Sequence, residues 1–177
     1  MATPENKKFA KIYDKHIDKI YRFIFLKTGT KEVAEDITSQ VFTKGWRKFK
    51  LQGHSIENMS AYLFQIARAE VANHYREASK FQIISAESVE IQDQSIGVEA
   101  SQSIQLDMSI IMTSLGGISE DYQNMLILKY VDGYSNKEIA TILGKSEGAV
   151  RVMTHRALEA LRDVFNNANG NVNKNSI

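Results

Sequence analysis

The apolar residues in the first eighty positions recur at steps of three and four, which is the repeat of an amphipathic α-helix. Three such stretches follow one another, over residues 5–28, 31–49 and 58–79, with short polar segments between them. Gly29 ends the first stretch, as expected for a residue that tolerates positive φ. Three helices of this length with short connections predict an antiparallel bundle over residues 5–80.

The helical repeat of apolar residues is absent directly after this bundle and returns further along the chain. From residue 81 to 105, isolated aliphatic residues alternate with serine, glutamine and acids, without a helical or strand repeat. These residues are predicted to be a flexible linker. The last residues, 166–177, are polar and low in complexity, which predicts a disordered tail.

A second helical domain is predicted over residues 106–165. Its first helix, over residues 106–115, is expected to end at Gly116 and Gly117. Ser119 is suited to cap a further helix that continues to Val131.

The strongest local pattern in this second domain is a helix-turn-helix over residues 135–162. Ser135 and Glu138 have the spacing of a capping box, in which each side chain accepts the backbone amide of the other residue. Gly144 permits the positive φ that ends the first helix, and Ser146 is placed to cap the second. Val150 is expected to pack the second helix against the first, because a helix-turn-helix needs an aliphatic residue at that distance from the turn.

The second helix carries polar side chains opposite its apolar stripe, which is the arrangement of a DNA recognition helix. Arginine pairs with guanine or phosphate, and an aliphatic group contacts the methyl group of thymine. Lys137 and Lys145 are placed for phosphate, where they position the protein without reading sequence. An ordinary helical hairpin with solvated arginines is the alternative. The residues predicted to contact bases are Arg151, Val152, His155 and Arg156.

Composition narrows the fold class and the possible chemistry. A single proline and few glycines favour an all-α protein. The absence of cysteine excludes disulfides and thiolate metal sites. No apolar run is long enough to cross a bilayer and no signal peptide is evident, so we expect a cytoplasmic protein.

The net charge of +1 hides a segregation of charge along the chain. Residues 1–80 contain fifteen Lys and Arg against nine Asp and Glu, whereas residues 81–128 contain seven acids and no base. Residues 129–177 are again basic, with seven bases against five acids. Two basic ends around an acidic middle suggest two modules that face nucleic acid. Chance segregation on solvated faces remains the alternative.

Three segments in order carry a family resemblance: AEDITSQVFTKGWRKF at 34–49, AYLFQIARAEVANHYR at 61–76 and LKYVDGYSNKEIATILGKSEGAVRVMTHRALEALR at 128–162. Together they resemble a bacterial RNA polymerase sigma factor of the two-domain, extracytoplasmic-function type. The resemblance implies that the chain binds core RNA polymerase and directs transcription from promoters. It also implies that the first domain is region 2 and the second domain is region 4.

The resemblance assigns expected partners to these domains. Region 2 is expected to dock on the clamp helices of the largest polymerase subunit through Asp36, Ser39 and Gln40, although the family more often has Gln-Glu where this chain has Ser39 and Gln40. The flap of the second-largest subunit is expected to bind as well. Region 4 is expected to read the −35 promoter element. The family is also commonly controlled by an anti-sigma protein.

The resemblance further implies that region 2 recognises and opens the −10 element. Strand opening needs stacking surfaces and cations that bind phosphate. The family often has asparagine at the position of Ala69, so the family's contacts with the −10 element cannot be assigned to this chain residue by residue. Phe64 and Trp46 are expected to belong to the hydrophobic core. The residues expected at the −10 element are His54, Asn58, Tyr62, Arg68, Asn73 and Arg76.

No active site is predicted for this chain. Its four histidines lack ligand spacing, and neither a phosphate-binding glycine loop nor a nucleophile motif is present, so no metal or cofactor is expected. Two other functions are compatible with parts of the sequence. One is a DNA-binding regulator that acts without polymerase, and the other is a helical adaptor that binds acidic proteins. The regulator leaves residues 34–49 without a purpose, and the adaptor does not require the turn at Gly144.

Overall fold

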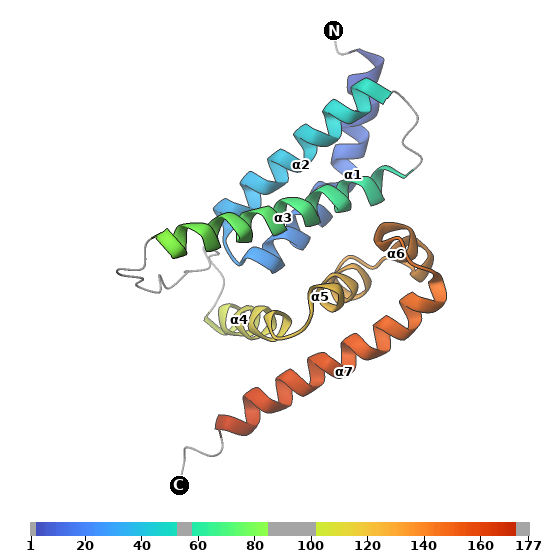
Figure 1. The fold of residues 1–177 in the computed structure, drawn as a ribbon. Coiled ribbons are helices and arrows are strands. Elements are labelled where there is room, and N and C mark those ends of the chain that lie inside the picture. Colours follow the sequence, from blue (N-terminus) through green and yellow to red (C-terminus); the bar gives the residue numbers. More distant parts are fainter. Residues whose placement is uncertain (1–2, 53–57, 85–101, 173–177) are drawn as a thin grey trace. The chain divides into compact units, whose positions relative to one another are not determined.

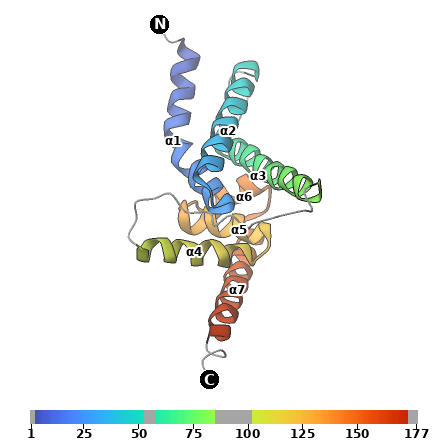
Figure 2. The same cartoon turned by 90° about the vertical axis from the view of Figure 1, so that its left-hand side faces the viewer.

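The structure is a computed structural model that describes residues 3–52, 58–84 and 102–172. The described residues are helical apart from short connections, which confirms the predicted all-α class. The chain divides into two units, residues 1–97 and residues 98–177. Figures 1 and 2 show the helices of each unit from two directions. The unit boundary lies within the linker that the sequence predicts.

The first unit is a bundle of three helices, α1 (Pro4–Thr28), α2 (Lys31–Gln52) and α3 (Met59–Ile84). Each helix contacts the other two. Gly29 adopts φ 72° and donates its amide to the carbonyl of Phe25, so it ends α1 as predicted. The fully buried aromatic pair Phe23 and Phe64 lies in this core, with ring centroids 5.3 Å apart in an edge-to-face arrangement. The prediction that Phe64 is a core residue is therefore confirmed.

Close packing in this bundle depends on Gly45 of α2. A Cβ atom at Gly45 would lie 2.8 Å from Cδ2 of Leu63, which is fully buried in α3. Any larger residue there must push the two helices apart or displace Leu63. At the next residue the prediction for Trp46 is wrong: its side chain is half-buried rather than in the core. It packs on one side against Phe9, at 5.0 Å between ring centroids, and its other side borders a surface groove.

The second unit begins with α4 (Gln102–Gly116), followed by α5 (Glu120–Leu126) and a short π-helical segment, η2 (Ile127–Val131). Ser119 caps α5 by accepting the amide of Tyr122 at 3.4 Å, as predicted. The π segment closes with a bond from the amide of Asp132 to the carbonyl of Ile127 at 3.0 Å. This wider turn continues the predicted helix to Val131.

The helix-turn-helix consists of α6 (Asn136–Leu143) and α7 (Glu147–Val172). The capping box is present in both directions: the Ser135 amide donates to Glu138 Oε2 at 2.8 Å, and the Glu138 amide donates to Ser135 Oγ at 3.3 Å. Gly144 has φ 64°, the left-handed conformation that the sequence predicts for it. Ser146 accepts the Ala149 amide at 3.2 Å and so caps α7. Val150 is fully buried at the contact of α7 with α6.

The predicted linker and tail are each too long. Helix α3 extends to Ile84 and α4 begins at Gln102, so the linker prediction is wrong at both of its ends. Neither helix contains a proline, and no glycine interrupts either one before Gly116, so nothing stops propagation beyond the predicted bounds. Helix α7 continues through residues 166–172, which were predicted to be disordered. Asparagine costs an established helix only tenths of a kcal/mol per residue, about 0.7 at most, so propagation continues through it.

Candidate nucleic-acid interface

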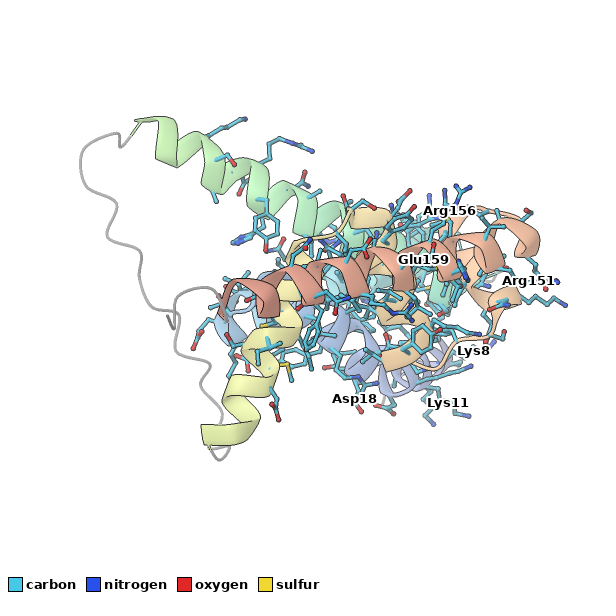
Figure 3. The ribbon with its side chains drawn as sticks, turned by 90° about the horizontal axis from the view of Figure 1, so that it is seen from below. Lys8, Lys11, Asp18, Arg151, Arg156 and Glu159 are labelled. Carbon is cyan, nitrogen blue, oxygen red and sulfur yellow. The ribbon has the colours of Figure 1, made fainter. Side chains whose placement is uncertain are left out.

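The outer face of α7 presents the four residues predicted to contact bases. Arg151, Val152, His155 and Arg156 are all exposed, and Val152 is exposed by 51% although it is aliphatic. Val150 and Ala157 are fully buried on the opposite side, and this packing fixes the rotation of α7 about its axis. Figure 3 labels Arg151 and Arg156, which extend outward from α7. An exposed methyl-bearing side chain between two arginines has the donors and the apolar contact that major-groove readout uses.

Two further side chains adjust the charge of this face. His155 Nδ1 lies 3.3 Å from Glu159 Oε2, one turn along α7, and both side chains are mostly exposed. Lys145, predicted to bind phosphate, has its Nζ 3.8 Å from Asp121 Oδ2 of α5. Lys137 is exposed in the first turn of α6. Such exposed ion pairs are weak, about 0–1 kcal/mol, so a phosphate can replace the carboxylate at little cost.

The predicted polymerase-docking residues form an exposed stripe on α2. Asp36, Ser39 and Gln40 are exposed, whereas Ile37 and Thr38 between them are buried. Residues three and four apart share one side of a helix, so the three side chains lie on the same side of α2. The stripe combines one negative charge with hydrogen-bonding groups, and no apolar side chain lies among the three.

A groove of about 760 Å³ runs between α1 and α2 beside this stripe. Ser39 belongs to both surfaces. Aromatic rings form much of the groove wall, including Tyr13, which is 41% exposed and packs edge-on against Phe42 at 4.7 Å. Burial raises the pKa of the Tyr21 hydroxyl, and the nearby carboxylates of Glu35 and Glu32 raise it further. The sequence pattern did not reveal this groove, because a helical repeat does not show where two packed helices leave a gap at the surface.

A second groove of the first unit lies between α2 and α3 and has a volume of about 500 Å³. Tyr62, predicted for the −10 element, lines it, as does Ala69. Leu51, which is 84% exposed, borders it. Three cations of α2 that the sequence analysis did not select also line this groove: Lys44, Arg47 and Lys48.

One of these cations is held in place by an ion pair. Lys44 Nζ lies 2.5 Å from Glu70 Oε1, whose side chain is only 11% exposed. The pair links α2 to α3 across the groove. Lys44 precedes Glu70 by 26 residues in the sequence. All three cations are on α2 whereas Tyr62 is on α3, so only the packing of the bundle brings them together. The closely spaced basic residues along α2 were the feature of the sequence that could have identified these cations.

The other predicted −10 residues are spread along α3 and its start. Asn58 is exposed, and its Oδ1 accepts the amide of Ala61 at 2.9 Å, so it caps α3. Arg76 Nη1 donates to Asn73 Oδ1 at 3.0 Å, and Arg68 is half-buried. None of these four lines the groove that contains Tyr62. His54 lies outside the described residues.

Two titratable side chains of the bundle serve its packing. The Tyr75 hydroxyl donates to the carbonyl of Lys27 and so links α3 to α1, and burial raises its pKa. His16 is 6% exposed on the inner face of α1. Burial lowers the pKa of His16, and the positive charges of Lys15 and Lys19 lower it further. His16 is therefore neutral in the folded protein at neutral pH.

The second unit has an apolar groove of about 490 Å³ on a side that the sequence analysis did not identify. It is formed by α4, the π segment and the later turns of α7. The wide turn of η2 leaves Tyr130 and Val131 exposed by 57% and 45%. Exposed apolar side chains gathered in one groove mark a binding surface for another protein. The others that line it and are exposed are Ile110, Ile111, Leu158 and Phe165.

Within the described residues, no helix is both long enough and apolar enough to cross a membrane. The same part of the chain contains no group of three or more histidine or acidic side chains placed to hold a metal ion.

Family models match both units. One, described as "Sigma-70 region 2", matches residues 12–81, and another, described as "Sigma-70, region 4", matches residues 108–161. The first match covers most of the three-helix bundle, and the second extends from α4 into α7. The two matches occur in the order that the sequence resemblance predicts.

Two curated proteins similar to this chain are named as sigma factors. The chain is 27% identical over 154 residues to "ECF RNA polymerase sigma factor BldN" of Streptomyces coelicolor, covering 86% of this chain and 58% of that protein. It is 28% identical over 152 residues to "ECF RNA polymerase sigma factor SigL" of Mycobacterium tuberculosis, covering 85% of each. The chain therefore spans just over half of the first relative and most of the second.

Solved structures agree on the fold. The sigma factor RpoE from Bartonella quintana, in complex with the anti-sigma factor NepR, superimposes with a TM-score of 0.69 at 22% identity. That match covers 90% of this chain and 98% of RpoE. CnrH, in complex with the cytosolic domain of CnrY, gives a TM-score of 0.67 at 17% identity.

Proposed function

Because the chain belongs to the sigma-70 family of RNA polymerase sigma factors and directs the polymerase to promoters, we propose that its two units divide this task. The second unit reads the −35 element, and the first unit docks on the polymerase and opens the −10 element. The observation that carries the proposal is the outer face of α7, where base-contacting side chains are exposed on a helix whose rotation is fixed by buried Val150.

In the −35 complex, α7 lies in the major groove. Arg151 and Arg156 donate to guanine or to phosphate, and Val152 contacts a thymine methyl group. His155 contacts a base edge or a phosphate from the same face. Lys137 and Lys145 bind phosphates on either side of the groove and set the register of the helix on the DNA.

Two surfaces dock on the polymerase. The stripe of Asp36, Ser39 and Gln40 binds the clamp helices of the largest subunit, and the aromatic groove between α1 and α2 extends this contact. The apolar groove of the second unit, which includes exposed Tyr130 and Phe165, receives the flap of the second-largest subunit. An acidic and polar stripe and an apolar groove favour different partners, so each unit is directed to its own part of the polymerase.

At the −10 element, the groove between α2 and α3 holds the displaced strand. Tyr62 offers a ring for base stacking, and Lys44, Arg47 and Lys48 bind the phosphates of that strand. Asn58, Arg68, Asn73 and Arg76 extend the same surface along α3, and His54 precedes it. Base stacking and phosphate binding together lower the cost of unpairing a duplex.

This role has further consequences for the protein. It acts without an active site of its own, since the polymerase carries out the chemistry, and it works in the cytoplasm, where promoter DNA is found. RpoE was solved with the anti-sigma factor NepR bound, which supports control of this chain by an anti-sigma factor.

Binding experiments with the free protein and with core polymerase test the proposal against the alternative regulator. A sigma factor binds core polymerase tightly and binds a promoter duplex specifically only as part of that complex. A polymerase-independent regulator binds the duplex by itself, as a dimer at a palindrome. Sedimentation of the free protein with labelled promoter DNA, with and without core polymerase, separates the two. Specific binding by the free chain and no association with polymerase would contradict the proposal.

A further inference from the structure

The outer side of α1 carries a row of basic side chains that neither docking surface uses. Its members recur at steps of three, four, four and three, which places them on one side of the helix. The row runs from residue 8 to residue 22, fourteen steps of the helix or about 21 Å along its axis. The side chains of this basic row are Lys8, Lys11, Lys15, Lys19 and Arg22.

The basic row is accessible from solvent over most of its length. Lys8, Lys11 and Lys15 are exposed, as is Arg22, and Lys19 is half-buried. Figure 3 shows Lys8 and Lys11 extending away from α1. Asp18 is also labelled there and lies next to the C-terminal half of the row, where it offsets part of the positive charge. Asp14, three residues after Lys11, is exposed as well, so an acid borders each half of the row.

The row concentrates positive charge on one side of α1. Its members lie three or four residues apart, so each is the neighbour of the next on the helix surface. Lys8 also lies close to the N-terminus of α1, whose helix dipole adds to the positive potential there. A row of cations on an exposed helix face is suited to a polyanionic partner.

We propose that the basic row on α1 binds the phosphate backbone of promoter DNA, without reading its sequence. The proposal rests on the proposed function, since it adds a contact to the same promoter complex. Lysine binds phosphate as a flexible point charge, and four of the five side chains are lysines. The length of the row matches a run of several phosphates on one strand, which are spaced 3.4 Å apart along the duplex axis, or about 20 Å for six base-pair steps.

An anionic membrane fits the row less well. A helix that lies on a membrane inserts an exposed apolar face beside its basic face. The apolar face of α1 is not available, because Phe9, Ile20, Phe23 and Ile24 are buried against the other two helices. Binding to lipid would then depend on charge alone.

The test uses the full chain assembled with core polymerase, and it compares K8Q/K11Q/K15Q with K8R/K11R/K15R. The measured quantity is the dissociation constant for a promoter fragment and for an unrelated duplex of equal length, over a range of salt concentrations. Each lost phosphate contact lowers the magnitude of the slope of log K against log salt by about 0.9. The glutamine variant changes three lysines, so the magnitude of its slope is expected to be lower than that of wild type by about two to three. Its affinity falls by the same factor on both duplexes, and the arginine variant keeps the wild-type slope.

Three results would overturn the proposal. The first is a glutamine variant with the wild-type salt slope. The second is a glutamine variant that binds core polymerase more weakly than the arginine variant, because the row would then serve the polymerase. The third is an unchanged slope together with loss of binding to phosphatidylserine vesicles, which would assign the row to a lipid surface. Thermal melting followed by circular dichroism confirms that both variants are folded.

The wild-type complex separates a failure of this proposal from a failure of the proposed function. If wild-type protein gives no specific promoter binding with core polymerase, the proposed function fails and the proposal about the row falls with it. If the wild-type complex binds its promoter and only the salt slope is insensitive to the glutamine changes, the row alone is misassigned.

Discussion

The two units of this chain bind their targets with surfaces of different construction. In the second unit, the residues proposed to contact DNA follow one another along a single helix, and local features fix their placement: the cap at Ser135, the turn at Gly144 and the buried Val150. In the first unit, the proposed strand-binding groove takes Tyr62 from α3 and Lys44 from α2. One surface is built from neighbours in sequence, and the other exists only after the bundle has packed.

This difference explains what the sequence predicted and what it missed. Capping boxes, glycine turns and helical repeats are short-range signals, so the helix-turn-helix and the order of the helices were predicted and are confirmed. The cations of α2 that face Tyr62 were missed, because their role depends on contact between helices that are distant in sequence. Trp46 was misplaced for the same reason: an apolar repeat shows which face is inward, but not where the core meets a groove.

The remaining errors concern helix ends and tails. The polar composition of residues 81–84 and 166–172 favoured a linker and a tail, and α7 continues through Gly170, which the sequence would suggest as a helix end. Adding residues to an existing helix costs less free energy than starting a new one, which accounts for both extensions. The apolar groove of the second unit could not be predicted, because the π turn that exposes Tyr130 and Val131 has no distinctive pattern in the sequence.

The largest effect on transcription is expected from changing the arginines of α7. The double change R151A/R156A removes two base or phosphate contacts, each contributing about 1–3 kcal/mol, so promoter-specific transcription is expected to fall at least about 30-fold. A promoter in which the −35 element has been replaced provides the control, because wild type and variant are expected to be equally active on it. Equal loss on both promoters would show that the variant damages something other than −35 recognition.

The next effect concerns the docking stripe of the first unit. Reversing its one charge with Asp36→Arg is expected to weaken binding to core polymerase about tenfold, or 1.4 kcal/mol, because the side chain is exposed and is proposed to face a basic partner. The matched control is Asp163→Arg, the same change of charge at an exposed position of α7. Fluorescence anisotropy of the labelled protein measures both. If the two variants lose the same affinity, the effect is one of net charge and the stripe is not the docking site.

A smaller effect distinguishes two glycines of the second unit. Gly144→Ala places a Cβ at φ 64° and is expected to lower the free energy of unfolding by about 1 kcal/mol. Gly116→Ala is the control. Gly116 is the last residue of α4, it has no positive φ, and no heavy atom lies within 4 Å of the new Cβ. This change is therefore expected to raise the free energy of unfolding by up to about 1 kcal/mol. Urea denaturation followed by circular dichroism gives both values. Effects of the same sign would show that the turn does not depend on the left-handed conformation.

The smallest effect is the response of the first unit to acid. Burial holds the pKa of His16 below its usual value of 6.5 in the folded state, so protons bind preferentially to the unfolded chain as pH falls through 6.5. The contribution of His16 is complete above that pH and is lost below it, with a limiting slope of about 1.4 kcal/mol per pH unit. Stability measured by denaturant from pH 7.5 to about 5.5 is expected to decline less steeply in His16→Leu than in wild type. Ile20→Val, a change at a buried position of α1 that involves no titratable group, is the control and is expected to keep the wild-type dependence.

Run-off transcription tests the central claim most directly. Core polymerase is incubated with fragments of the source genome, with and without this protein, and the transcripts are mapped at their 5′ ends. The account predicts discrete transcripts that require the protein and that share a −35 element lost to the R151A/R156A variant. Tight binding of the protein to core polymerase without any new transcript, on any fragment, would contradict it.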